Sequence, residues 1–278
     1  MGFSKTGISQ PDALLRRYGK MDIPNTGPWN DVISSILSHQ SVRSYKPDAL
    51  PDYTLETLMA AAQSAATSSN MQVWSLVSIK DSKKKIELAK IAGNQKHIEE
   101  CPLFLVWLAD LSRNDRLGTD EGVEMVVSPY VETFLVAAID AALAAQNAVV
   151  AAESIGLSTV YIGAMRNNPK RVGELLELPP QVFPVFGLCV GYAKEDNLGE
   201  IKPRLPQPAV AFKEVYGIDN ERELRARYDN EMAEFSSRHE IATDTWTKKV
   251  INRMGSLTGM NGRETLLGVL SSMGFPLR

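Results

Sequence analysis

Apolar positions along the chain divide it into strands and helices. Residues 72–81 alternate between apolar and polar side chains, which is the pattern of a half-buried strand. Residues 102–110 form an almost continuous apolar run, which indicates a central strand covered on both faces. Two further apolar runs, residues 157–165 and 182–192, complete a predicted set of core strands.

Helices are predicted between and beyond these strands. Residues 130–155 form a long helix that ends at Gly156, the residue type that commonly follows a helix C-terminus. Asn168 and Pro169 mark the start of another helix, because Asn is a favoured N-cap and Pro a favoured first residue. The other predicted helices cover residues 31–37, residues 51–66 and charged segments from about residue 219 onward.

Changes in composition along the chain predict three parts. Residues 1–30 contain several prolines and show weak periodicity, which is typical of an arm. Residues 31–215 hold the predicted strands and form the core, and residues 216–278 form a charged, helical C-terminal extension.

The long predicted helix is rich in alanine on more than one face. Small side chains allow close approach by other elements, as in the centre of a domain or of a dimer. Alanine also has the highest intrinsic helix propensity, so both explanations stay open. The alanines concerned are Ala137, Ala138, Ala141, Ala142, Ala144, Ala145, Ala148, Ala151 and Ala152.

Composition limits the classes of partner. The chain has 278 residues, 44% of them hydrophobic, which is enough for one large core. A net charge of -3 argues against nucleic acid, since phosphate contacts need a basic surface. Asp140 and Glu153 interrupt the longest apolar stretch, so no membrane span is expected. The N-terminus has no apolar signal segment, which predicts a cytoplasmic protein.

Several catalytic motifs are absent from the sequence. There is no dinucleotide-binding G-x-G-x-x-G after a strand, no P-loop and no G-x-S-x-G elbow. His39, His97 and His239 lack metal-binding spacing, so no metal site is expected, and His97 is interpreted as a surface or capping residue rather than a base. Cys101 and Cys189 are expected to be buried free thiols rather than a disulfide.

Two pairs of polar residues predict an anion clamp. Ser41 and Arg43 are two positions apart, so in an extended segment they point to the same side and can grip one anion. Lys202 and Arg204 repeat this spacing around a proline, which favours extended backbone before it. The alternative is that these residues lie on a solvated surface, as most Arg and Lys residues do.

A small-residue turn is predicted to follow one of the core strands. Gly163 and Ala164 end the run that begins near Val160, and their small size leaves room for a flat ligand to approach the backbone. A phosphate clamp and a flat slot together favour a planar, phosphorylated ligand.

These segments and others, in this order along the chain, resemble the oxygen-insensitive, NADPH-type nitroreductases and their flavin-reductase relatives. The resemblance runs from about Ile33 to the C-terminus. Its motifs are HQSVRSY at 39–45, the cluster Thr67, Ser68 and Ser69, GNQKH at 93–97, AAQNAVVAAESIGL at 144–157, YIGAMRNN at 161–168 and KPRLP at 202–206.

The resemblance implies an α+β, nitroreductase-like fold in which helices flank a central, mainly antiparallel sheet, with a C-terminal helical extension. It also implies an FMN-dependent homodimer that takes electrons from NADPH or NADH and passes them to small planar acceptors. Hydride would reach flavin N5 directly, with no catalytic side chain, while the backbone of Gly163 and Ala164 lies near N5. The two substrates would use one slot in turn.

Site residues implied by the resemblance fall into groups. His39, Gln40, Ser41 and Arg43 would contact the phosphate and ribityl end of FMN, and Lys202 and Arg204 would close on it. The partner subunit would contribute its own Thr67, Ser68 and Ser69. Gln95 would bind the ribityl chain or ring edge, Tyr161, Ile162, Gly163 and Ala164 would line the ring, and Arg238 would bind the nucleotide.

Three departures from the family pattern affect these expectations. The family usually has Arg in place of Gln40, so FMN is expected to be held less tightly. The family also has Gly in place of Ala164, and the alanine methyl either narrows the slot or points away. Ala242 and Thr243 stand where two arginines often hold the 2′-phosphate of NADPH. Because Arg238 remains alone, NADPH preference is expected to be reduced, with NADH also used.

The expected function is two-electron reduction of nitroaromatics, quinones, azo compounds or flavins. Two alternatives stay open. One is a flavin reductase that supplies free reduced FMN to another enzyme. The other is a flavin-binding or sensing protein without catalytic activity.

Overall fold

The computed structural model describes residues 8–21, 23–195, 199–239 and 245–278. Its contacts divide the chain into two units, each made from two separate stretches. The first unit comprises Met1–Gln40 and Leu198–Met260, and the second comprises Ser41–Asn197 and Asn261–Arg278. The predicted three-part division along the chain stays a prediction.

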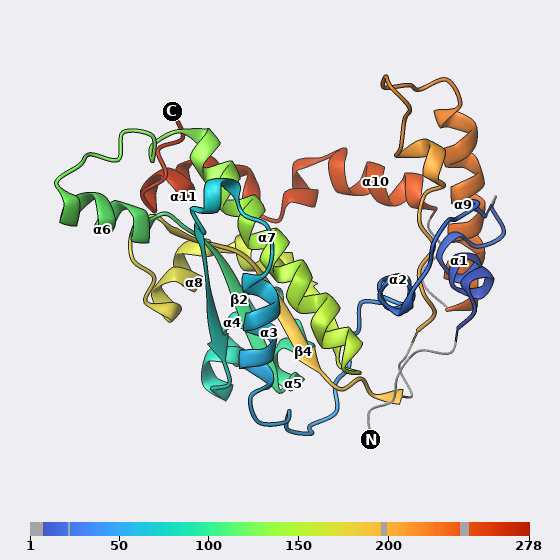
Figure 1. The fold of residues 1–278 in the computed structure, drawn as a ribbon, viewed down its shortest axis with the longest axis horizontal. Helices are drawn as coiled ribbons and strands as arrows, with labels where there is room; N and C mark the ends of the chain where they lie inside the picture. Colours follow the sequence, from blue (N-terminus) through green and yellow to red (C-terminus); the bar gives the residue numbers. More distant parts are fainter. Residues whose placement is uncertain (1–7, 22, 196–198, 240–244) are drawn as a thin grey trace. The chain divides into compact units, whose positions relative to one another are not determined.

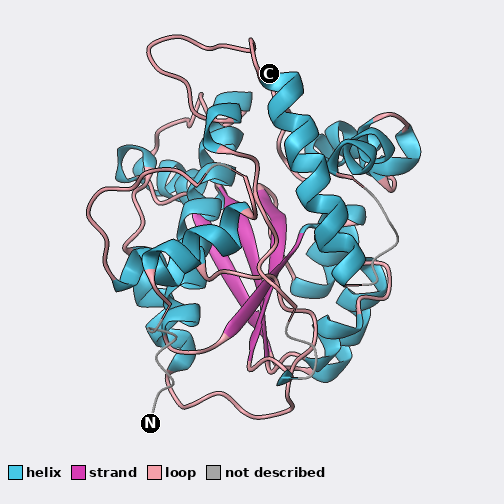
Figure 2. Ribbon diagram, turned by 90° about the vertical axis from the view of Figure 1, so that its right-hand side faces the viewer, coloured by secondary structure: helices cyan, strands magenta, loops and turns pink. Residues whose placement is uncertain are grey.

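The second unit is built on a four-stranded sheet with the order β1-β2-β4-β3, in which every neighbouring pair is antiparallel. Figure 2 shows these strands in magenta, crossing one another with the twist usual for a sheet. The prediction of a mainly antiparallel sheet flanked by helices is therefore confirmed. The strands are β1 (Trp74–Ile79), β2 (Leu103–Asp110), β3 (Ser158–Ile162) and β4 (Val182–Gly191).

Helices cover both faces of this sheet (Figure 1). Those of the second unit are α3 (Thr54–Gln63), α4 (Ser82–Ile91), α5 (Lys96–Glu100), α6 (Ser112–Glu121), α7 (Val131–Ser154), α8 (Pro169–Leu176) and α11 (Leu266–Ser272). The short 3-10 helices of this unit are η1 (Ser68–Asn70), η2 (Gly163–Asn167) and η6 (Arg263–Thr265).

Strand β2 is buried along its whole length, as its continuous apolar run predicts. Successive side chains of a strand point to opposite faces. Phe104 and Val106 pack with α4, α5 and α8 in one core, whereas Leu105 and Trp107 pack with α3 and α7 in another. The central position of β2 between β1 and β4 therefore explains why its sequence does not alternate.

The alanines of α7 serve packing within the unit. Ala141, Ala145 and Ala148 are buried in the core that α7 shares with α3 and β2. The opposite side of the helix exposes larger apolar residues, which are considered below. By length and composition alone α7 could span a membrane, but its alanine side lies within this core, and its charged residues Asp140 and Glu153 are buried.

Several element boundaries differ from the predicted ones. Strand β1 begins at Trp74 rather than near residue 72, where Gln72 has a left-handed backbone with φ of 51°. Strand β3 ends at Ile162, because the chain turns there into η2. Residues 51–53 lie outside α3. The predicted start of α8 is confirmed, since the Asn168 side chain accepts a hydrogen bond from the Arg171 amide and Pro169 is the first helical residue.

The first unit contains only helices and connecting segments among its described residues. Its elements are α1 (Gln10–Tyr18), α2 (Asp31–Leu37), η4 (Gln207–Ala209), α9 (Glu221–Arg238), α10 (Trp246–Met254) and η5 (Leu257–Met260). Met21, Tyr228, Met232 and Phe235 form its small core. The weak periodicity of the arm gave no indication of α1, which begins at the N-cap Ser9.

Candidate functional site

The Ser41–Arg43 pair lies on one side of an extended segment, as the spacing predicts. Ser41 and Arg43 are exposed, while Val42 between them is buried. The Val42 amide donates to the carbonyl of Thr159 at 3.0 Å, and Ser41 forms a parallel bridge with the same residue. The segment is therefore fixed against the start of β3, the strand that leads to the predicted ring-binding turn.

The Lys202–Arg204 pair shows the same alternation within the first unit. Both cationic side chains are exposed and Pro203 is buried. The Tyr228 hydroxyl donates to the Pro203 carbonyl at 2.9 Å, and the Lys202 ammonium lies 5.9 Å from the centre of the Phe235 ring. Helix α9 therefore holds this segment in place through two aromatic residues.

Arg17 links His39 to Lys202 and was not predicted as a site residue. Its side chain is 8% exposed. One guanidinium nitrogen donates to the carbonyls of Leu37 at 2.6 Å and His39 at 2.8 Å, and another donates to the Lys202 carbonyl at 3.3 Å. A signal for it exists in the sequence, because Arg17 follows Ala13 and Leu14 at helical spacing and so lies on their buried face.

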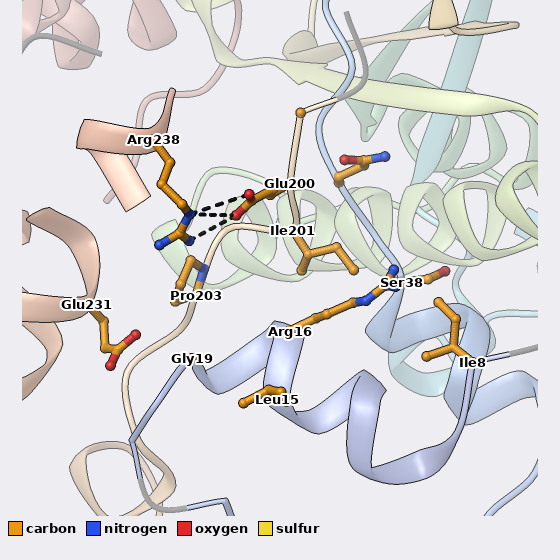
Figure 3. Close-up of a pocket in the computed structure, with 12 residues that line it drawn as sticks. Ile8, Leu15, Arg16, Gly19, Ser38, Glu200, Ile201, Pro203, Glu231 and Arg238 are labelled. Carbon is orange, nitrogen blue, oxygen red and sulfur yellow. Dashed lines mark hydrogen bonds and ion pairs between the residues drawn. The ribbon is translucent and has the colours of Figure 1, made fainter. Parts of the chain in front are cut away.

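A cavity of about 710 Å³ lies in the first unit, shown in Figure 3. Among the residues that line it are Gln40, which is predicted to contact FMN, and Arg238, which is predicted to bind the nucleotide. Arg16 and Glu200 line it as well. The cavity therefore combines a cofactor candidate and a nucleotide candidate with charges of both signs.

Arg238 is engaged by a carboxylate in this cavity. Its Nε and Nη2 donate to Glu200 Oε2 at 3.2 and 2.9 Å. Hydrogen bonds from Arg238 lower the pKa of Glu200, so this carboxylate is ionised at neutral pH. Ala242 and Thr243, the departures predicted to weaken NADPH recognition, lie outside the described residues.

The predicted ring-binding turn joins β3 to η2 in the second unit. The Tyr161 ring meets Phe186 edge to face at 5.0 Å between centroids, and its hydroxyl lies 3.3 Å from Gln146 Oε1. Ile162 is buried. The three atoms nearest to a Cβ built on Gly163 all belong to the Arg166 guanidinium, at 3.4 Å or more, which is ordinary van der Waals contact.

Ala164 packs into the core of the second unit with Met165. Both possibilities for its methyl group, a narrower slot or a methyl that points away from it, stay predictions.

Gln95 and His97 lie at the start of α5. The Gln95 side-chain amide donates to the Ala92 carbonyl at 2.9 Å, just after the end of α4. Burial lowers the pKa of His97, and the positive charge of Arg43 lowers it further, which favours the neutral imidazole.

The loop of Thr67, Ser68 and Ser69 is anchored by a buried carboxylate. The Ser68 amide donates to Asp140 Oδ1 at 3.2 Å, and Asp140 is 2% exposed. Its Oδ2 has no hydrogen-bond partner among the described residues. Ser69 has a left-handed backbone with φ of 49°, so Asp140 holds a strained loop in place.

Cys101 and Cys189 are buried and free, as predicted. They lie in the same core cluster, although 88 positions in the sequence separate them. Burial raises the pKa of the Cys189 thiol. No group of three or more His, Cys, Asp or Glu side chains among the described residues could hold a metal ion.

Comparison with known proteins gives a consistent result along the chain. The sequence pattern described as "Nitroreductase family" matches residues 36–192, and that described as "Nitroreductase family, C-terminal domain" matches residues 202–278. The chain is 39% identical over 230 residues to the FMN reductase (NADPH) of Bacillus subtilis, covering 81% of this chain and 92% of that relative.

Two further relatives extend the comparison. The oxygen-insensitive NADPH nitroreductase of Salmonella typhimurium is 36% identical over 220 residues, which cover 78% of this chain and 88% of that protein. The structure of the NADPH:FMN oxidoreductase of Vibrio harveyi complexed with NAD+ superposes with a TM-score of 0.80 at 34% identity, over 90% of this chain and 100% of that one. The chain therefore belongs to the nitroreductase family.

Proposed function

We propose that this chain is an FMN-dependent NAD(P)H oxidoreductase that reduces nitroaromatics, quinones, azo compounds or flavins by two electrons. The observation that carries the proposal is the exposure of both predicted pairs of anion-binding residues, each held on one side of a fixed backbone segment. Family membership adds the expectation that the phosphate-bearing ligand is a flavin. The enzyme is proposed to act in the cytoplasm.

The described residues fit FMN by their chemistry. Ser41 and Arg43 offer a hydroxyl and a guanidinium to the phosphate, as Lys202 and Arg204 offer two cations. His39 and Gln40 would complete the phosphate contacts, and Gln95 would bind the ribityl chain or ring edge. Tyr161, Ile162, Gly163 and Ala164 would lie along the ring.

Bound FMN would supply the hydride chemistry, and the residues of the chain control position and access. Asp140 fixes the loop of Thr67, Ser68 and Ser69, which is proposed to reach the flavin of the partner subunit. Arg17 fixes His39 and Lys202 by their carbonyl groups. No side chain is needed as an acid or base for the transfer itself.

A homodimer is part of the proposal. Four apolar side chains spaced by four residues form an exposed stripe along α7: Val131, Leu135, Ile139 and Leu143, each between 45% and 55% exposed. A stripe of large exposed apolar side chains is typical of an interface. The core of residues 31–215 would carry FMN, and the extension of residues 216–278 would contribute to the nucleotide site and the dimer.

A flavin reductase that releases reduced FMN is the second candidate, because a relative that is 39% identical bears the name FMN reductase (NADPH). Kinetics with different acceptors separate the two functions. Free FMN would be the preferred acceptor of a flavin reductase, with a kcat/KM well above those for nitrofurazone and quinones.

Absorbance in the flavin bands of the purified protein tests the proposal directly. We expect yellow protein, bleached anaerobically by NADPH or NADH and reoxidised by nitrofurazone or a quinone. Initial rates at several acceptor concentrations should give parallel double-reciprocal lines, because the nucleotide and the acceptor are proposed to bind alternately in one slot. Colourless protein that takes up no added FMN would overturn the proposal. A preference for NADPH above about a hundredfold in kcat/KM would contradict use of both nucleotides.

A further inference from the structure

Arg238 forms a two-pronged ion pair with Glu200 at the edge of the cavity in the first unit. Guanidinium nitrogens Nε and Nη2 of Arg238 lie 3.2 and 2.9 Å from Glu200 Oε2, and Nε lies 3.4 Å from Oε1 (Figure 3). His239 Nε2 also lies 3.6 Å from the same Oε2. Glu200 thus occupies the donors of Arg238 that a phosphate would use.

Charges around the cavity are balanced rather than positive. Arg16 and Arg238 contribute two cations, and Glu200 and Glu231 contribute two carboxylates. Glu231 also acts electrostatically on Arg238. A ligand that brings a dianionic group to Arg238 must therefore displace one carboxylate and approach another.

We propose that Glu200 is a specificity-determining residue that disfavours nucleotides with a 2′-phosphate by competing for Arg238. This inference rests on the proposed function and deepens it. A 2′-phosphate needs the Arg238 donors that Glu200 occupies. A nucleotide with a 2′-hydroxyl leaves the ion pair intact, so NADH binds without this cost.

Exposure of the pair sets the size of the effect. The side chains of Arg238 and Glu200 are 49% and 52% exposed, so water screens the pair and displacement is possible. Glu200 therefore shifts the selectivity without excluding NADPH. Removing its charge should raise the preference for the 2′-phosphate about 1.5- to fivefold, the range expected of an exposed charge contact.

Glu200→Gln in the full-length, FMN-loaded protein tests the inference. Titration calorimetry with adenosine 2′,5′-bisphosphate and with 5′-AMP measures binding without turnover. We expect the ratio of the two affinities to rise about 1.5- to fivefold, and the ratio of kcat/KM for NADPH and NADH to follow it. Glu221→Gln removes the same charge from an exposed pair with Arg225 in the same unit and should leave both ratios unchanged.

A double-mutant cycle shows whether Glu200 acts through Arg238. Glu200→Gln should have no effect on the affinity ratio in an Arg238→Gln background, whereas a general charge effect would persist there. An unchanged ratio in Glu200→Gln, or an equal effect in both backgrounds, would overturn the role of Glu200. Absence of FMN binding and of nucleotide oxidation in the wild type would instead overturn the proposed function.

Discussion

Arg17 donates a hydrogen bond to the carbonyl oxygen of His39 at 2.8 Å, from a guanidinium group that is almost completely buried. The same side chain also binds the carbonyls of Leu37 and Lys202. A buried cation thus fixes the backbone of two predicted FMN contacts that are far apart in sequence.

Arg17→Met should therefore weaken both folding and flavin binding. Loss of three charge-assisted hydrogen bonds made by a buried guanidinium costs about 2–4 kcal/mol of stability. We expect a lower denaturation midpoint and a Kd for FMN raised about tenfold, measured by flavin fluorescence. The exposed Arg222→Met on α9 is the control. Wild-type stability and flavin affinity in Arg17→Met would contradict this role.

Gln40→Arg should strengthen flavin retention. Gln40 lines the cavity at the position where the family usually carries a cation, so the substitution adds a charged contact to the phosphate. We expect the Kd for FMN to fall about three- to tenfold and less flavin to be lost on gel filtration. Gln40→Met controls for the change in side-chain shape. Retention that is unchanged or poorer in Gln40→Arg would count against the weakened clamp.

Asp140→Ala should release the loop of Thr67, Ser68 and Ser69. The buried Asp140 carboxylate accepts a hydrogen bond from the Ser68 amide. Removal of that acceptor costs about 1–3 kcal/mol of stability. Asp140→Asn keeps the acceptor oxygen and should retain most of the FMN affinity that Asp140→Ala loses. Equal FMN affinities in the two variants would show that this hydrogen bond does not position the loop.

Ile139→Glu should convert the proposed dimer to a monomer. Ile139 is 55% exposed in the middle of the apolar stripe on α7, and a buried carboxylate at an apolar interface is strongly unfavourable. Light scattering after gel filtration measures the change in mass. Leu117→Glu on α6 places the same charge at another exposed leucine and should not alter the mass. A dimer that persists in Ile139→Glu would exclude this stripe as the interface.

His97 should make the protein less stable in acid. Burial, and then Arg43, lower its pKa below the ordinary value of 6.5, so the unfolded chain takes up a proton more readily than the folded one. The resulting stability is fully present above pH 6.5 and is lost as the pH falls through the folded-state pKa. Denaturation midpoints at pH 7.5 and 5.5 should differ more in the wild type than in His97→Gln. Equal differences in the two proteins would show that His97 does not contribute to the loss of stability in acid.

Local sequence patterns determined the four strands, the long helix and the cap at Asn168. Periodicity and capping depend on neighbours within a few residues, so they can be recognised without the rest of the chain. The same is true of the pairs Ser41–Arg43 and Lys202–Arg204, since alternation along an extended segment fixes the side to which they point. The family motifs added which ligand to expect.

Only the tertiary structure decided which distant residues meet. Arg17 with Lys202, Glu200 with Arg238, and Cys101 with Cys189 are brought together by the path of the chain between them. No local pattern encodes these contacts, because each depends on how whole helices and strands pack. The burial of Ala164 in the core likewise depends on the turn into η2, which follows β3.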